Sequence, residues 1–117
     1  AVEEVEWKAM EYAIEFERRS QRIPEDVSGI EHYDIKSLDP RTGEVRFIEV
    51  KGRWHLDIAV ELTEAEYEYA RKLGGNYWLY IVYGFSTGSP RLLAIKDPAN
   101  RARWSTVEIK RYRLLGA

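Results

Sequence analysis

Three side chains that could bind a metal ion and help water attack a phosphate lie on two neighbouring segments with the alternation of β-strands. Asp34 lies in residues 32–38, while Glu49 and Lys51 lie in residues 44–54. The intervening Asp-Pro-Arg-Thr-Gly sequence is rich in turn formers, so the two segments predict a β-hairpin. With residues 39–44 as its loop, Asp34 lies directly opposite Glu49, and Lys51 shares their face.

Two opposed carboxylates repel each other when both are ionised, unless a cation lies between them. Oxygen ligands of this kind suit Mg²⁺ or Mn²⁺, and Lys51 would add positive charge beside the attacking water. The alternative is an ordinary solvated strand face with a cross-strand salt bridge, because Glu-x-Lys is common on exposed strands. The hairpin alone leaves both interpretations open.

The elements around the hairpin predict an α/β domain with a central mixed sheet flanked by helices. Apolar residues at helical spacing predict a helix from Val2 to about Arg19, and residues 22–30 are interpreted as a connecting loop. A capping box at Thr63-Glu64-Ala65-Glu66 and a stop at Gly74-Gly75 bound a second helix. Further strands are expected at residues 77–83, 91–95 and 107–114, with a short helix or loop from Asp97 to Trp104.

Length and composition favour one domain over residues 1–117, expected to be part of a longer protein. The chain is 44% hydrophobic, its formal net charge is −2, and it has no cysteine, which excludes disulfides and thiolate chemistry. The longest apolar run is too short to span a membrane, and the first residues lack the features of a signal peptide. We therefore expect a cytoplasmic protein without a membrane partner.

The order of these parts resembles the PD-(D/E)XK nuclease signature, with Tyr33-Asp34-Ile35 carrying the first acid and residues 48–52, Ile-Glu-Val-Lys-Gly, the second acid and the lysine. More narrowly, positions 9–98 resemble the domain found at the C-terminus of the plant protein NO VEIN and in many prokaryotic helicase-associated and defence-associated proteins. His32 departs from this family, which usually has Gly there. The matching pieces are Glu17-Arg18, Tyr33–Ser37, Gly43–Arg53, Leu62–Glu66, Tyr77–Tyr80 and Asp97-Pro98.

This resemblance implies a restriction-endonuclease-like core and a metal-dependent active site. Asp34 and Glu49 would ligate Mg²⁺ or Mn²⁺ with the carbonyl of Val50 as a third ligand, and Lys51 would orient or deprotonate the water. Glu17 would be a fourth catalytic acid at the border of the first helix's apolar stripe. Its alternative role is that of one more Glu on an acidic helix.

Several further residues are weaker candidates. Lys36, Arg53 and His55 could contact substrate phosphates, although such side chains near strand surfaces are usually only solvated. Thr63 and Glu66 are explained as a helix cap, and the aromatic residues of segment 77–83 as core. The basic residues after position 100 could form a phosphate-contacting rim or merely guard an edge strand: Arg101, Arg103, Lys110, Arg111 and Arg113.

The function that we expect is metal-dependent hydrolysis of DNA phosphodiester bonds, with RNA not excluded, by a module of a helicase-associated or defence protein. One alternative is a catalytically idle module of the nuclease fold that binds nucleic acid or a partner protein. A plain interaction domain without a metal is a third. Contacts with other domains of the parent protein, and a homodimer, are left open.

Overall fold

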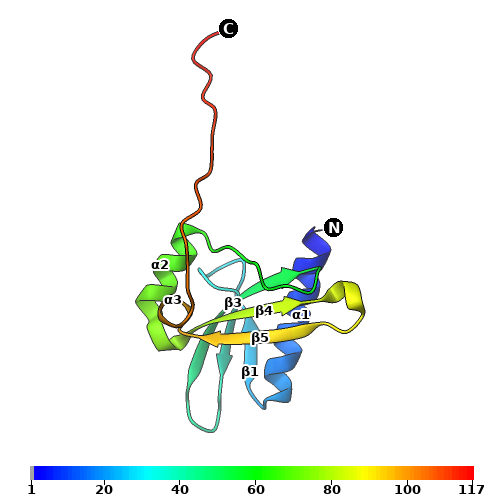
Figure 1. The fold of residues 1–117 in the computed structure, drawn as a ribbon. Coiled ribbons are helices and arrows are strands. Elements are labelled where there is room, and N and C mark those ends of the chain that lie inside the picture. Colours follow the sequence, from blue (N-terminus) through cyan, green and yellow to red (C-terminus); the bar gives the residue numbers. More distant parts are fainter. Residues whose placement is uncertain (1) are drawn as a thin grey trace.

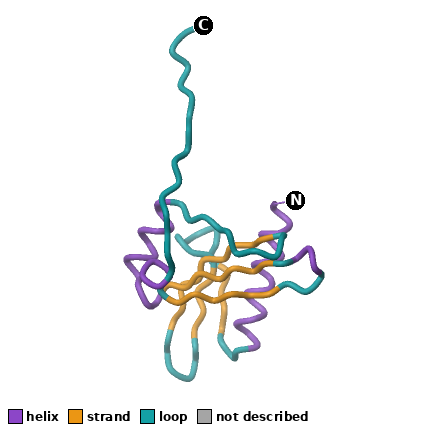
Figure 2. Tube along the Cα trace, in the orientation of Figure 1, coloured by secondary structure: helices purple, strands orange, loops and turns teal. Residues whose placement is uncertain are grey.

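The computed structural model describes residues 2–117 as a mixed β-sheet with helices packed on it (Figure 1; Figure 2). The chain therefore has the α/β architecture that the sequence predicts. Two short 3-10 turns, Gly74–Asn76 and Phe85–Thr87, precede and follow the fourth strand. The elements in chain order are α1 (Val2–Arg19), β1 (Ile23–Asp26), β2 (Ile35–Leu38), β3 (Val45–Arg53), α2 (Glu64–Leu73), β4 (Tyr77–Tyr83), β5 (Arg91–Lys96) and α3 (Pro98–Arg101).

The five strands lie side by side in the order of the sequence, β1-β2-β3-β4-β5. Strands β3 and β4 are parallel because α2 carries the chain back between them, and the other neighbours are antiparallel. In the β2–β3 hairpin, Leu38 pairs with Val45 and Ile35 with Ile48, as the turn chemistry predicts. The confirmed register places the residues before Ile35 beside those after Ile48.

Helix α1 covers one face of the sheet. Its small residue Ala13 packs with Ile35, Ile48 and Tyr80 in a core of fully buried side chains. The helix lies so close to β3 that a Cβ at Gly52 would come within 3.0 Å of Val5 and Ala9. A side chain at Gly52 would therefore push α1 away from the sheet.

Helix α2 covers the other face, because the strand residues that it contacts alternate with those facing α1. Ala70 and Tyr77 pack there with Val27 and Tyr33. The predicted capping box is confirmed: the hydroxyl of Thr63 accepts from the backbone N–H of Glu66, 3.1 Å away. This cap fixes where α2 begins and holds Glu66 near the sheet.

Three expectations about local structure are wrong. Residues 23–26 form strand β1, because Pro24 is tolerated on an edge strand that pairs only with β2. Residues 107–114 form no strand and extend away from the body (Figure 2). The alternation of residues 32–38 predicts Tyr33 on the same face as Ile35, but Tyr33 packs under α2, because the chain bends there before β2 begins. Among residues 2–117, no helix has both the length and the apolar character needed to cross a bilayer.

Candidate active site

The carboxylates of Asp34 and Glu49 meet beside the β2–β3 hairpin, as the strand register predicts. Asp34 lies immediately before β2, where its backbone N–H donates to the carbonyl of Ile48 over 2.9 Å. Its Oδ2 accepts from the backbone N–H of Val50 over 2.8 Å, so the carboxylate is held against β3. Glu49 is only 5% exposed. Two acidic groups therefore share one poorly solvated site.

Lys51 lies on the same face of β3 as Glu49 and pairs with two carboxyl groups. Its Nζ is 3.5 Å from Oε2 of Glu49 and 3.0 Å from Oε1 of Glu66. Glu66 also accepts from the backbone N–H of Thr63 in the capping box. The capping-box pattern predicts only a helix-cap role for Glu66, yet its carboxylate both caps α2 and completes the charged cluster.

Burial and repulsion make Glu49 a weak acid. Removal from water, the negative charge of Asp34 and the contact with Glu66 together raise its pKa to about 9. Burial likewise raises the pKa of Asp34, although hydrogen bonds from the Val50 N–H and from Glu49 partly oppose the shift. Burial and the neighbouring negative charges therefore both favour a protonated carboxyl group in this cluster.

The neighbouring groups are charged. Burial alone would lower the pKa of Lys51, but Glu49 and Glu66 outweigh it and the net shift is upward. Burial acts to raise the pKa of Glu66, but hydrogen bonds from Glu49, Thr63 and Lys51 bring it below its usual value. Because Nζ of Lys51 is closer to Glu66 than to Glu49, the Lys51–Glu66 pair is the ionised one.

Tyr77, at the start of β4, carries an uncommitted polar group beside this cluster. The side chain is completely buried, and its hydroxyl has no hydrogen-bond partner among residues 2–117. Burial is the largest cause of its raised pKa, and the negative charges of Glu49, Glu66 and Asp34 raise the pKa further. The sequence assigned Tyr77 to the core, and it packs there, but it also leaves an unused donor near the acids.

The donor set fits Mg²⁺ or Mn²⁺. Asp34 and Glu49 supply oxygens, and burial together with the negative charges of Asp34 and Glu66 raises the pKa of Glu49. The side chain of Val50 packs in the core facing α1, so it can contribute only its backbone carbonyl. Within residues 2–117, no three acidic or imidazole side chains form a ready-made metal cage. An ion here would therefore depend on water and phosphate oxygens as well, as Mg²⁺ sites commonly do.

The cluster lies on the wall of an open cleft of about 1150 Å³ between the start of α1, the end of β3 and residues 59–61. Trp7 and Trp54 line it and are exposed. Its basic residues are Lys8, Lys51 and Arg53, of which Lys8 pairs with Glu4. The acidic residues outnumber them: Glu3, Glu4, Glu6, Asp26, Asp34, Glu49 and Glu61.

The three predicted phosphate contacts lie in different surroundings. Arg53 lines the cleft, but its guanidinium is bound by Asp57 at 2.9 and 3.2 Å. His55 is exposed and follows β3, and it is not among the residues that line the cleft. Lys36 is exposed on β2 opposite Phe47, two pairs from the level of Glu49. Of the three, only Arg53 borders the cleft that holds the acidic cluster.

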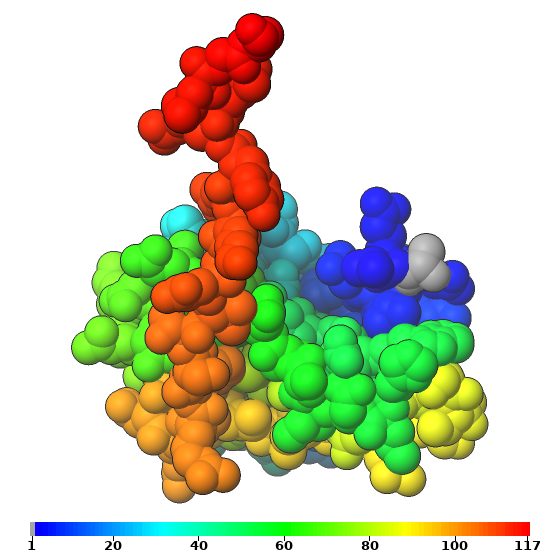
Figure 3. Space-filling view, turned by 45° about the horizontal axis from the view of Figure 1, so that its top comes forward, coloured from blue at the N-terminus to red at the C-terminus, as the bar shows by residue number. Residues whose placement is uncertain are grey.

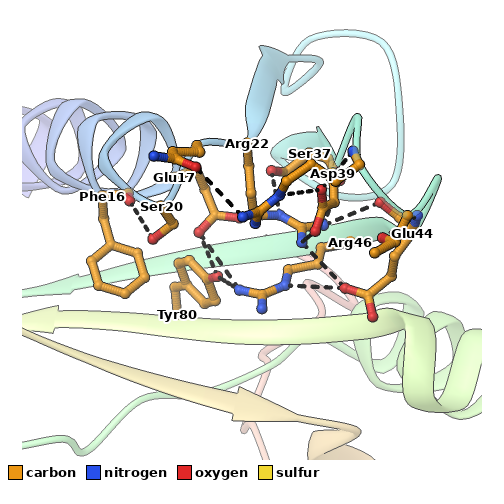
Figure 4. A network of polar contacts seen from close by, with 12 residues as sticks. Phe16, Glu17, Ser20, Arg22, Ser37, Asp39, Glu44, Arg46 and Tyr80 are labelled. Atoms are coloured by element: carbon orange, nitrogen blue, oxygen red, sulfur yellow. Dashed lines mark hydrogen bonds and ion pairs between the residues drawn. The ribbon is translucent and has the colours of Figure 1, made fainter.

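Glu17 is buried facing the sheet, as its position on the helix predicts, but it does not join Asp34 and Glu49. Figure 4 shows it in a separate network, where Oε1 pairs with Arg22 at 3.3 Å and Oε2 accepts from the hydroxyl of Tyr80 at 2.8 Å. Arg46 completes the network, 3.7 Å from Glu17. Tyr80 points to the α1 face and Glu49 to the α2 face, so the sheet separates the two groups. This geometry corrects the expectation of a fourth catalytic acid.

Comparison with protein families gives a match over most of the chain. The sequence model described as "Protein NO VEIN, C-terminal" matches residues 5–95, which include every strand except the last residue of β5. The matched segment contains Asp34, Glu49, Lys51 and Glu66. No curated protein matches the chain, and no solved structure does.

Proposed function

The chain belongs to the family of the C-terminal domain of protein NO VEIN, and we propose that it is a metal-dependent nuclease that hydrolyses phosphodiester bonds of DNA. The observation that carries this proposal is the meeting of Asp34 and the buried Glu49 beside the ammonium group of Lys51, on the wall of an open cleft. Titratable groups with strongly shifted pKa values in a cleft are typical of active sites.

Each residue has a distinct task in the proposed reaction. Asp34, held in place by the Val50 N–H, and Glu49 would hold Mg²⁺ or Mn²⁺, together with the carbonyl of Val50. The ion, when bound, would supply positive charge to the phosphate and make water more acidic. Lys51 would stabilise negative charge that develops on the phosphate, and Glu66 would keep its ammonium group in position.

The architecture supports the same proposal. A mixed sheet with α1 on one face and α2 on the other, and with the acids on neighbouring strands, is compatible with a restriction-endonuclease-like core. We assign DNA as the substrate with RNA as the alternative, and we propose that the domain acts as a module of a helicase-associated or defence protein. Arg53, His55 and Lys36 remain the proposed phosphate contacts.

One observation favours a second candidate function, a catalytically idle module that docks a partner protein or nucleic acid. The cleft is lined mainly by acids, and the ammonium group of Lys51 is already engaged by Glu66. Acidic walls repel phosphates, so nucleic acid would depend on the metal ion or on a partner for its affinity. In this alternative the charged cluster would be a structural feature of the docking surface.

A cleavage assay separates the two functions. The purified protein would be incubated with single-stranded and duplex DNA and with RNA, in Mg²⁺, in Mn²⁺ and in a chelator. We expect metal-dependent cleavage that Glu49→Gln and Lys51→Met each abolish. Glu64→Gln, which removes an exposed carboxylate two residues from Glu66, should cleave normally. Cleavage that survives in Glu49→Gln would remove the cluster from the chemistry, and no cleavage of any substrate would favour the idle module.

A further inference from the structure

The cleft carries a surface that is both acidic and apolar. Glu3 and Glu6 on α1, and Glu61 on the opposite wall, form no ion pair with any residue in the described range 2–117. Between these walls, Trp7 is 61% and Trp54 is 49% exposed. Uncompensated acids around exposed tryptophans favour a ligand that combines positive charge with apolar side chains.

The chain itself contains a segment with that chemistry. Residues 105–117, here called the tail, include Lys110, Arg111 and Arg113 but one acid, Glu108. The tail has no regular secondary structure, and its large apolar side chains are exposed, with Tyr112 at 94%. The others are Val107, Ile109, Leu114 and Leu115. Soluble domains rarely leave so many neighbouring apolar residues uncovered.

The tail leaves the body close to the cleft. Trp104, the residue before it, donates through Nε1 to the carbonyl of Pro98 over 2.8 Å and packs edge-on against Tyr67 of α2. Figure 1 shows the tail rising beside the end of α2 that the loop from β3 enters, and that loop contributes residues 59–61 to the cleft. In Figure 3 the tail (red), this loop (green) and the start of α1 (blue) lie on the same side of the molecule.

We propose that the cleft is a docking surface for the tail of the same chain. Thirteen residues can span about 45 Å when extended, and the two shorter dimensions of the molecule are 35 and 27 Å. The tail is therefore long enough to cross from α2 to the start of α1. Its basic residues would lie against Glu3, Glu6 and Glu61, and its apolar residues against Trp7 and Trp54.

The match in chemistry favours the tail over nucleic acid as the occupant. Nucleic acid could stack on the tryptophans, but its phosphates would face the unpaired carboxylates. The tail offers the opposite charge together with apolar surface. A docked tail would cover Lys51 and Glu49, so any ligand of that site would have to displace it. This inference does not depend on the proposed nuclease activity, because docking can be measured without a substrate.

Spin-label distances in the complete chain test the docking. The chain has no cysteine, so Gly116→Cys at the end of the tail and Ser86→Cys give two specific labels. Ser86 is exposed, and its backbone N–H donates to the carbonyl of Trp54 over 2.9 Å. We expect a short-distance population that persists when the labelled chain is diluted with excess unlabelled chain, and that shrinks as salt rises from 0.1 to 1 M.

Charge-reversal variants test whether the cleft is the surface to which the tail docks. Glu3→Lys with Glu6→Lys should reduce the ratio of docked to free tail by about fivefold or more, as expected for two surface pairs turned repulsive. Adding Arg111→Glu and Arg113→Glu should restore it. Glu11→Lys with Glu15→Lys, on the same helix but outside the cleft lining, is the control. A single long distance at all salt concentrations would overturn the proposal, as would a short distance that unlabelled chain removes, which would indicate the tail of a second copy.

Discussion

Metal binding should release a proton from Glu49. With its pKa raised to about 9 by burial and by the neighbouring carboxylates, Glu49 should be protonated at pH 7, about two units below that value. A divalent ion must displace this proton to use both oxygens of the carboxylate. Competition from the proton should therefore weaken metal binding about 100-fold at pH 7 relative to a pH well above 9.

Calorimetric titration of Mn²⁺ in two buffers with different ionisation enthalpies measures this proton directly. We expect about one proton released per ion at pH 7, and an affinity that rises about tenfold per pH unit from pH 6 to 8.5. The pKa itself can be followed by carbon NMR of the Glu49 carboxyl in the metal-free protein. Asp34→Asn removes one of the repelling charges and should lower it. Metal binding without proton release, or a pKa near 4.5, would refute the reasoning.

Other consequences concern stability. The raised pKa means that the folded state keeps a proton on Glu49 that the unfolded chain loses above about pH 4.5. The free energy of unfolding of the metal-free protein should therefore fall as pH rises from 4.5 to 9. Glu49→Gln should remove this pH dependence in thermal melts. Asp34→Asn keeps an oxygen for the Val50 N–H and should melt near the wild type, whereas Asp34→Ala should lose about 1–3 kcal/mol in denaturant unfolding. Glu17→Gln removes the fully buried partner of Arg22, which keeps Asp39 and Glu44, and should cost about 1–3 kcal/mol, with Mn²⁺ affinity unchanged. A loss of metal binding in a folded Glu17 variant would return it to the site.

Local signals decided how much of the fold could be predicted. The helical spacing of apolar residues predicts where α1 begins and ends, and the capping box and the paired glycines predict the bounds of α2. Strand β1 escaped prediction because Ile23-Pro24-Glu25-Asp26 has neither alternation nor a buried face, and it is a strand only through pairing with β2. Residues 107–114 of the tail were expected to form a strand, but they pair with neither edge of the sheet, and Trp104 fixes the chain beside α2.

In the candidate site, too, only the contacts that local sequence specifies could be predicted. The pairing of Asp34 with Glu49 follows from hairpin register, which turn residues specify locally. The contact of Glu66 with Lys51 depends on how α2 packs across the sheet, and no spacing in the sequence encodes that distance. Glu17 was expected to face the sheet and does so, but which face α1 covers is a tertiary property, and that face is opposite to the one carrying Glu49.

The proposed function requires that Asp34 and Glu49 hold a divalent ion for phosphodiester hydrolysis. Its most direct test is anomalous diffraction from crystals of the protein grown with Mn²⁺ and a short oligonucleotide. We expect an anomalous peak about 2.1 Å from carboxylate oxygens of both residues, with a phosphate oxygen on the same ion. Ordered Mn²⁺ and oligonucleotide located elsewhere, with the Asp34–Glu49 cluster free of metal, would contradict it.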